Sequence, residues 1–457
     1  MLFGRPILMT TALVLLAALI GGVSYLHRIA LVGAGYIARD TCVEVFHAGR
    51  DADTIPEMDF ANLDPRLGLI ALKTDTEAET ISAGFGPIGR TLAVHIPGYG
   101  CVIKRGKLPD LPALAPITET SIPVGDPAAL GFDAEALSTA LDEEFADPLP
   151  EHRAMLILRK GQLVAERYAP GFDADTPMVS ASMAKSVTEM MIGAAVQEGL
   201  VNIDDRAPVE AWSGSDDPRS AITWRHLLQM QSGLEFDERY LSPFADVPRM
   251  NVLEDSAAAF AIDKPLAHEP GAEWKYSTGT SNILQHILRV ALEEQGVNYH
   301  TYARDKLFEP LGMAHTINVP DRAGDFIGGS YTFATAREWA KLGQLHLQNG
   351  LWDGEQILPA DWSEFVSTPA LDSDQMYGGQ VWLNNPGTDG REKFHPMLPD
   401  STYMFFGYRG QIVAIVPEYE MVLVHLGRTP TDPSEEQVPI NEAWEKIMAA
   451  FVERPSR

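Results

Sequence analysis

The chain is poor in positive charge and in cysteine. Its 457 residues include 35 Lys and Arg against 63 Asp and Glu, which gives a net charge of −28. Such a surface repels a phosphate backbone and argues against nucleic acid as a partner. The 2 cysteines, Cys42 and Cys101, are too few for a four-cysteine zinc site or a disulfide-dense small domain. The 45% of hydrophobic residues predict a sizeable core, and the length predicts one large domain with appended segments.

Residues 6–26 form a run without any charged side chain. As a helix this run is long enough to cross a hydrocarbon core of roughly 30 Å. A cleaved signal peptide is the alternative, but no small-x-small cleavage site follows directly, which favours an uncleaved membrane anchor. Both interpretations export the rest of the chain, and we expect it on the periplasmic side of the inner membrane. In that compartment Cys42 and Cys101 can form a disulfide.

A glycine pattern after the membrane run resembles a dinucleotide-binding turn, in the segment 33–38. Such a turn must open a helix inside a βαβ unit, yet a strand-like run at 42–48 begins four residues later. We therefore expect no nucleotide site there. The predicted organisation is an anchor or signal segment at 1–30, an exported extension packed on the main domain at 31–120, and the main domain at 121–457.

Apolar periodicity in the main domain predicts helices and hairpins in a definite order. The predicted helices cover 133–145, 182–198 and 441–452, and the predicted hairpins cover 154–168 and 412–426. Strands at both ends of the domain, with helices between them, predict an α+β fold. Its antiparallel sheet is formed by the N- and C-terminal segments of the domain, with helices packed on it and an all-helical region inserted.

Ser182 and Lys185 lie three residues apart at the start of the predicted helix, so their side chains face the same way. A serine hydroxyl is a weak nucleophile until a base takes its proton, and a lysine is such a base when burial lowers its pKa. Ser-x-x-Lys pairs occur in penicillin-recognising enzymes. The pattern fixes only two positions, however, and a helix-capping serine beside a surface lysine is the alternative.

The Ser-Lys pair lies within the first of several motifs that follow one another along the chain. They are Pro177–Ser186, Thr223–Leu234, Pro270–Gly279, Phe308–Met313 and Phe406–Gln411. With these motifs, residues 121–457 resemble the serine β-lactamase and penicillin-binding-protein superfamily. The resemblance is to the class C-like branch, which also holds carboxylesterases, D-aminopeptidases and 6-aminohexanoate-dimer (nylon oligomer) hydrolases. The segments Ser232–Tyr240 and Pro396–Pro399 are most similar to the nylon-oligomer hydrolases.

The resemblance implies roles for individual residues. Ser182 and Lys185 are the nucleophile and base, and Tyr276 is the tyrosine that relays a proton to the leaving group. The backbone N–H groups of Ser182 and Gln411 form the oxyanion hole. The residues expected to contact substrate are Tyr240, Thr278, Tyr408 and Gly410. The mechanism needs no metal and no organic cofactor, and the sequence contains neither His-Glu-x-x-His nor Gly-x-Ser-x-Gly.

Two departures from the superfamily pattern bear on the substrate. A β-lactamase is expected to carry Tyr-x-Asn and Lys-x-Gly, whereas this chain has Thr278 and Tyr408 at the corresponding positions. The sequence therefore predicts a serine hydrolase that cleaves small esters or linear amides through an acyl-serine. A β-lactamase or peptidoglycan DD-peptidase is one alternative, and a non-catalytic binding module of the same fold is another. The sequence leaves the natural substrate and the oligomeric state open.

Overall fold

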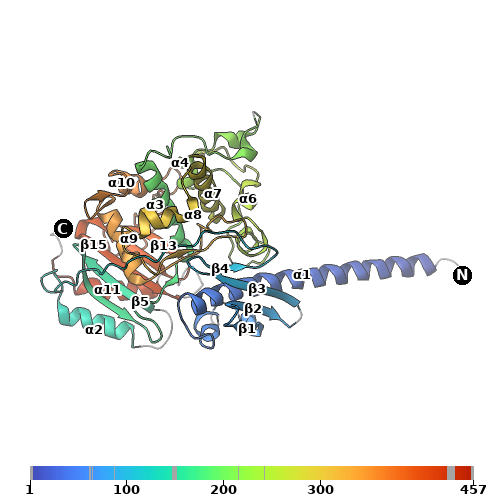
Figure 1. The fold of residues 1–457 in the computed structure, drawn as a ribbon, viewed down its shortest axis with the longest axis horizontal. Coiled ribbons are helices and arrows are strands. Elements are labelled where there is room, and N and C mark those ends of the chain that lie inside the picture. The colour runs from blue at the N-terminus through green and yellow to red at the C-terminus, as the bar shows by residue number, and fades with distance from the viewer. Residues whose placement is uncertain are drawn as a thin grey trace.

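A six-stranded antiparallel sheet forms the centre of the main domain in the computed structural model (Figure 1). The structure describes residues 4–60, 63, 65–86, 88–146, 152–214, 216–240, 242–429 and 438–453, so residues 1–3 of the predicted segment 1–30 lie outside the described residues. In spatial order the strands are β12 (Trp382–Leu383), β13 (Tyr403–Gly407), β14 (Gln411–Val416), β15 (Met421–Gly427), β5 (His152–Arg159) and β6 (Gln162–Tyr168). The N-terminal hairpin thus pairs with C-terminal strands, as predicted.

Two layers of helices cover the sheet because its strands are apolar on both faces. Leu137 and Trp444 belong to α2 (Ala134–Glu144) and α11 (Val438–Ala449), and they pack with Ile157 and Leu423 on one face. The opposite face packs on α9 (Ala336–Leu347). The other helices of the domain are α3 (Ala184–Gln197), α4 (Trp224–Leu228), α5 (Asp246–Pro248), α6 (Ala257–Ile262), α7 (Thr278–Glu294), α8 (Tyr299–Ala303) and α10 (Trp362–Ser367). This arrangement confirms the predicted α+β class.

Two smaller sheets complete the main domain. A three-stranded sheet in the order β7 (Met178–Val179), β9 (Thr332–Ala334) and β8 (Ile317–Asn318) leads the chain into α3. A separate two-stranded hairpin joins β10 (Leu351–Trp352) to β11 (Glu355–Gln356). The turn between β5 and β6 has positive φ at both Lys160 and Gly161, +49° and +74°. This is the backbone that a two-residue hairpin turn requires.

The N-terminal helix α1 (Gly4–Phe46) projects far from the body and then continues into it (Figure 1). The helix is long and apolar enough to cross a membrane, a property that a signal sequence shares. The side chains described from Leu13 to His27 are exposed, whereas most of those from Arg28 to Phe46 are buried or half-buried. The strand-like run expected at 42–48 is therefore wrong. Residues 42–46 are helical because α1 buries one face of this segment against a second sheet.

That second sheet lies within the extension and contains four strands. They are β1 (Ala71–Asp75), β2 (Thr80–Phe85), β3 (Ile88–Ile96) and β4 (Gly100–Ile103), paired in chain order. Cys42 of α1 and Cys101 of β4 form a disulfide with the Cα atoms 6.0 Å apart. The bond joins α1 covalently to the sheet on which it packs.

Buried charges join the extension to the main domain. The Asp59 carboxylate lies 2.7 Å from Arg153 of β5, 3.1 Å from Arg428 and 2.9 Å from Arg50. Burial raises the pKa of Asp59, but Arg153, Arg428 and Arg50 outweigh this effect and lower it. Asp59 is thus a buried anion whose charge three guanidinium groups stabilise.

Candidate active site

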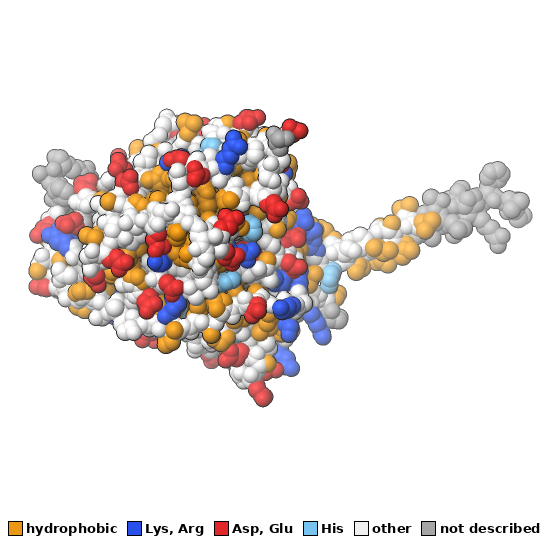
Figure 2. Space-filling view, turned by 45° about the horizontal axis from the view of Figure 1, so that its top comes forward, with side chains coloured by type: hydrophobic (Ala, Val, Ile, Leu, Met, Phe, Trp, Pro, Cys, Tyr) orange, Lys and Arg blue, Asp and Glu red, His pale blue; other side chains and the backbone are white. Residues whose placement is uncertain are grey.

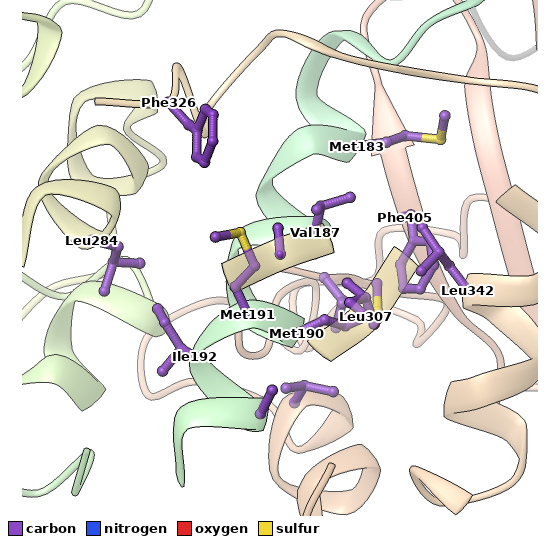
Figure 3. Packing of buried hydrophobic residues seen from close by; sticks show 14 of the residues in the cluster. Met183, Val187, Met190, Met191, Ile192, Leu284, Leu307, Phe326, Leu342 and Phe405 are labelled. Atoms are coloured by element: carbon purple, nitrogen blue, oxygen red, sulfur yellow. The ribbon is translucent and has the colours of Figure 1, made fainter. Parts of the chain in front are cut away.

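Ser182 lies in a short 3-10 turn, Ala181–Met183, directly before α3. Ala181 has a φ of +44°, a left-handed conformation that costs a non-glycine residue about 1–2 kcal/mol. Met183, Val187 and Met190 of this segment point into the core (Figure 3). Because the helix is packed on several sides, its first turn is held firmly in place.

Lys185 is buried, with 1% of its surface exposed, and lies beside the nucleophile. Its Nζ donates to Ser182 Oγ at 3.1 Å, to Thr278 Oγ1 at 3.1 Å and to the Gly329 carbonyl at 2.7 Å. Burial lowers the pKa of Lys185 to about 8, against the opposing charge of Glu238. At pH 7 roughly a tenth of this lysine is therefore uncharged and able to accept a proton, and the fraction grows as the pH rises through 8.

Tyr276 completes the group around Ser182. Its ring centroid lies 4.9 Å from Lys185 Nζ, and its phenol shares a hydrogen bond with Ser182. Burial and the charge of Glu238 raise the pKa of the phenol, so it stays protonated. Tyr377 and Trp382 pack on the ring, with centroids at 5.8 and 5.3 Å. The structure thus brings together the three residues predicted to carry catalysis.

Glu238 is a member of the site that the sequence analysis did not identify. Its carboxylate accepts hydrogen bonds from the Thr278 backbone N–H at 2.8 Å, from the Thr278 hydroxyl, and from the Tyr240 hydroxyl at 3.1 Å. Burial raises the pKa of Glu238, and Lys185 opposes this effect. The segment 232–240 already marked the resemblance, but a carboxylate in a loop carries no sequence feature that reveals its burial beside a lysine.

Thr278 lies in this hydrogen-bond chain. Its side chain is buried between Lys185 and Glu238 and is absent from the wall of the cavity that contains Ser182. A direct contact of Thr278 with substrate stays a prediction. As the first residue of α7, Thr278 accepts a hydrogen bond from the lysine and donates one to the carboxylate, so it positions the base.

The glycine of the third motif that lies against the nucleophile is Gly407, three residues before the expected Gly410. Gly407, at the end of β13, lies against the nucleophile: a Cβ added there would be 2.2 Å from the Ser180 carbonyl and 3.2 Å from Ser182 N. Gln411 lies opposite Gly407 on β14, and its side-chain amide donates to the Arg409 carbonyl. A Cβ on Gly410 would meet Thr429 and Ile440, on the side away from the cavity.

This geometry corrects two expectations, the oxyanion role of Gln411 and the substrate contact of Gly410. Residues 408–410 form the turn between β13 and β14, so Gly407, and not Gly410, is the glycine of this motif that lies against the nucleophile. The backbone N–H that follows Gly407 belongs to Tyr408.

A cavity of about 300 Å³ opens beside Ser182. Tyr240 and Tyr408 line it, with ring centroids 5.1 Å apart, so the structure brings together these two predicted substrate residues. The opposite wall includes residues of α1. Such a volume is typical of a small-molecule site.

The described residues contain one cluster of potential metal ligands, Glu119, Asp175 and His315. None of these residues belongs to the group around Ser182, and the two carboxylates are exposed.

Comparisons with known proteins support this description. A family model described as Beta-lactamase matches residues 153–443. The 6-aminohexanoate-dimer hydrolase of Paenarthrobacter ureafaciens is 25% identical over 295 residues, which cover 61% of this chain and 73% of the relative. The monacolin J acid methylbutanoyltransferase of Aspergillus terreus is 29% identical over 239 residues, 48% of this chain and 52% of the transferase.

Among solved structures, a candidate 6-aminohexanoate-dimer hydrolase from Bacillus anthracis has a TM-score of 0.55 and 20% identity. The match covers 73% of this chain and 89% of that protein. At this identity the likeness concerns the fold alone.

Proposed function

The chain belongs to the β-lactamase family, and we propose that it cleaves esters or linear amides through an acyl-serine intermediate on Ser182. The observation that carries the proposal is the 3.1 Å contact between Lys185 Nζ and Ser182 Oγ, made by a buried lysine with a lowered pKa. In its neutral form Lys185 takes the proton of Ser182 as the hydroxyl oxygen attacks the carbonyl carbon.

The oxyanion formed by this attack needs two hydrogen-bond donors. The Ser182 backbone N–H is one, and the position of Gly407 favours the Tyr408 backbone N–H as the other. Donors placed before the reaction stabilise the developing charge without reorganisation. A glycine at 407 fits this role because any side chain there would collide with the Ser180 carbonyl.

Tyr276 acts as the general acid. Its raised pKa keeps the phenol protonated, and its hydrogen bond to Ser182 places it beside the reacting centre. It protonates the departing alcohol or amine as the carbonyl–oxygen or carbonyl–nitrogen bond breaks. A water molecule then attacks the acyl-serine and gives its proton to the Tyr276 phenolate, while Lys185 returns its proton to Ser182 Oγ as the carboxylic acid leaves.

Ester and linear-amide substrates are favoured over β-lactams by the third motif. With Gly407 as the glycine of this motif, the cation position two residues earlier is occupied by Phe405, which is buried, and the cavity presents the rings of Tyr240 and Tyr408. The 6-aminohexanoate-dimer hydrolase of Paenarthrobacter ureafaciens, whose name describes a linear-amide substrate, supports the same preference.

The N-terminal helix is proposed to remain as an anchor through residues 6–26, with the hydrolase on the periplasmic side. The continuity of α1 supports this, because the helix runs without a break into the segment held by the Cys42–Cys101 disulfide. The test is the N-terminal mass of the protein extracted from membranes. An intact N-terminus is expected, and a chain that begins after residue 26 would identify a signal peptide.

The test of the function uses the full-length chain in detergent with three substrates: a short-chain p-nitrophenyl ester, a linear aminohexanoate dimer and a chromogenic cephalosporin. Wild type is compared with Ser182→Ala. We expect Ser182-dependent turnover of the ester or the dimer and none of the cephalosporin. Cephalosporin turnover alone would support the β-lactamase alternative. No turnover of any of the three would favour the binding module.

A further inference from the structure

The cavity at Ser182 has an unusual second wall, formed by the N-terminal helix. Tyr25, Ile29, Val32, Tyr36 and Asp40 of α1 all line it. Their spacing of three or four residues defines one face of a helix. At 1.5 Å per residue, this face extends for about 22 Å. The cavity therefore runs along α1 from the exposed segment of the helix to the nucleophile.

Most of the lining near α1 is apolar. Ile29 and Val32 of the helix face Phe60, Leu67 and Phe85 of the extension across the cavity. A hydrocarbon chain gains free energy from burial in such surroundings in proportion to its length. A short polar substrate would leave this part of the cavity unused.

Exposed apolar side chains surround α1 at the level where the cavity begins. Phe244 is 40% exposed and stacks on Tyr25 with centroids 4.8 Å apart. Ile88 is 46% exposed, and the neighbouring Gly89 lies directly on Ala30. Leu69 is 71% exposed, in the short turn that contacts α1 at Gly33. If residues 6–26 cross the bilayer, these side chains reach its surface.

The charge at this end of the body fits a membrane surface. Figure 2 shows Lys and Arg side chains on the body beside the base of α1, although the whole chain carries a net charge of −28. Arg28 lies over the Phe244 ring at 5.1 Å, and Arg90 follows Gly89 on β3. Basic side chains at this level favour contact with anionic lipid head groups.

From these observations we propose that the substrate is a long-chain acyl ester or amide of the bilayer, whose acyl chain enters along α1 and lies in the cavity between α1 and the catalytic domain. The inference rests on the proposed function and specifies its substrate class. Ser182 lines the cavity and Tyr276 does not, so the acyl chain lies on the cavity side and the leaving group on the side of Tyr276.

The reaction follows the same steps as the general hydrolysis. Ser182 Oγ bonds to the acyl carbon, the carbonyl–oxygen or carbonyl–nitrogen bond breaks, and the head group leaves with a proton from Tyr276. Water then releases a long-chain fatty acid and restores Ser182. No oxidant, reductant or further co-substrate is needed.

The experiment uses the full-length chain in phosphatidylcholine–phosphatidylglycerol vesicles. Two esters with the same leaving group are compared: p-nitrophenyl acetate in the aqueous phase and p-nitrophenyl palmitate in the bilayer. Gly33→Leu introduces a side chain into the cavity wall at a position where a Cβ makes only ordinary contacts, 3.4 Å or longer. Gly22→Leu is the matched control, because it makes the same change on the exposed part of α1, where nothing lies within 4 Å.

We expect Gly33→Leu to lower the ratio of kcat/KM for p-nitrophenyl palmitate to kcat/KM for p-nitrophenyl acetate by about tenfold, the equivalent of two methylene groups removed from the cavity. Gly22→Leu should alter neither value. Ile29→Trp, with Leu26→Trp as its control, should repeat the pattern if Gly33→Leu perturbs folding.

Different outcomes separate the two proposals. Ser182-dependent acetate turnover without palmitate turnover would overturn the bilayer substrate and leave the hydrolase function standing. The bilayer substrate would also be overturned if Gly33→Leu and Ile29→Trp lowered the hydrolysis of the acetate and palmitate esters to the same extent. It would be overturned as well if these variants lowered neither activity. Absence of any Ser182-dependent turnover in wild type would overturn the hydrolase function, and the bilayer substrate with it.

A further comparison tests entry through the membrane. We expect p-nitrophenyl palmitate in the same vesicles as the protein to be cleaved faster than the same ester in separate vesicles. In the shared bilayer its acyl chain reaches the cavity without crossing water. Equal rates in the two arrangements would overturn this route.

Discussion

Lys185 Nζ lies 3.1 Å from Thr278 Oγ1, the same distance that separates it from Ser182 Oγ. Thr278 in turn donates to Glu238, so the base of the proposed mechanism is joined to a half-buried carboxylate through one hydroxyl. Burial of Lys185, which has 1% of its surface exposed, lowers its pKa, and the charge of Glu238 partly offsets that effect without a direct ion pair. The pKa of the lysine therefore stays in the range where it can both accept and release a proton.

Replacement of Glu238 by Gln should shift the pH dependence of ester hydrolysis. Burial lowers the pKa of Lys185 to about 8, so the neutral base becomes more abundant, and kcat/KM rises, as the pH passes through 8. Glu238 raises this pKa, and its removal should move the rise to lower pH by about one unit. The pH–rate profile of Glu238→Gln measures the shift.

Asp237→Asn is the control for this prediction, because Asp237 is next in sequence but pairs with Arg239 near the surface. Its profile should match wild type. A Glu238→Gln profile that stays in place or moves to higher pH would contradict the proposed electrostatic role.

The loss of the Tyr276 hydroxyl should affect amides more than activated esters. An amine must be protonated to leave, whereas p-nitrophenolate leaves without help. Tyr276→Phe should therefore lower kcat/KM, which reports acylation, by about 10²–10⁴ for a linear amide and much less for a p-nitrophenyl ester. Tyr377→Phe, in the same aromatic cluster, serves as the control. Equal losses for both substrates would argue against a general-acid role.

A methyl group at position 407 should disrupt the oxyanion hole. The added Cβ of Gly407→Ala would lie 2.2 Å from the Ser180 carbonyl, so the strand end or the nucleophile turn must move. Displacement of one oxyanion donor costs about 10²–10³ in kcat. Gly214→Ala is the control, since its Cβ meets only Asp217 at 3.9 Å. Unchanged kinetics in Gly407→Ala would show that Tyr408 N–H is not a donor.

Removal of the Asp59 charge should destabilise the whole protein. Asp59→Asn leaves three guanidinium groups without their shared anion, which typically costs about 3–5 kcal/mol for a buried pair. Denaturant unfolding of wild type, Asp59→Asn and the exposed control Asp53→Asn measures the difference. An effect as small as that of Asp53→Asn would contradict the role of this cluster in docking the extension.

The same cluster predicts an acid sensitivity. The arginines hold the pKa of Asp59 below its unfolded value of about 3.9. Its stabilisation is therefore present above about pH 4 and is lost as the pH falls below that value. The stability difference between wild type and Asp59→Asn should narrow on acidification, and a constant difference would contradict the linkage.

Local patterns predicted the parts of the fold that depend on local physics. The hairpin expected at 154–168 corresponds to β5 and β6, and the helix expected at 182–198 to a 3-10 turn followed by α3. Alternation and helical spacing determine such elements directly. The Ser182–Lys185 pair was visible for the same reason, because both residues lie on one turn.

The remaining features depend on contacts between distant segments. Glu238 is recognisable only once its loop has met Thr278, 40 residues later in the chain. The residue whose backbone N–H lies at the oxyanion position, Tyr408 in place of the expected Gln411, depends on where the β13–β14 turn begins. The helical structure of residues 42–46 depends on the sheet against which α1 packs. The sequence of those five residues alone does not predict this packing.

The most direct test of the account is the location of the acyl group. The full-length protein would be mixed with a p-nitrophenyl ester, quenched in acid within the first turnovers, digested and analysed by mass spectrometry, beside Ser182→Ala. The account predicts the mass of the acyl group on the peptide that contains Ser182 and an unmodified peptide in the variant. Ester hydrolysis that continues at the wild-type rate in Ser182→Ala, or acylation at a different residue, would contradict it.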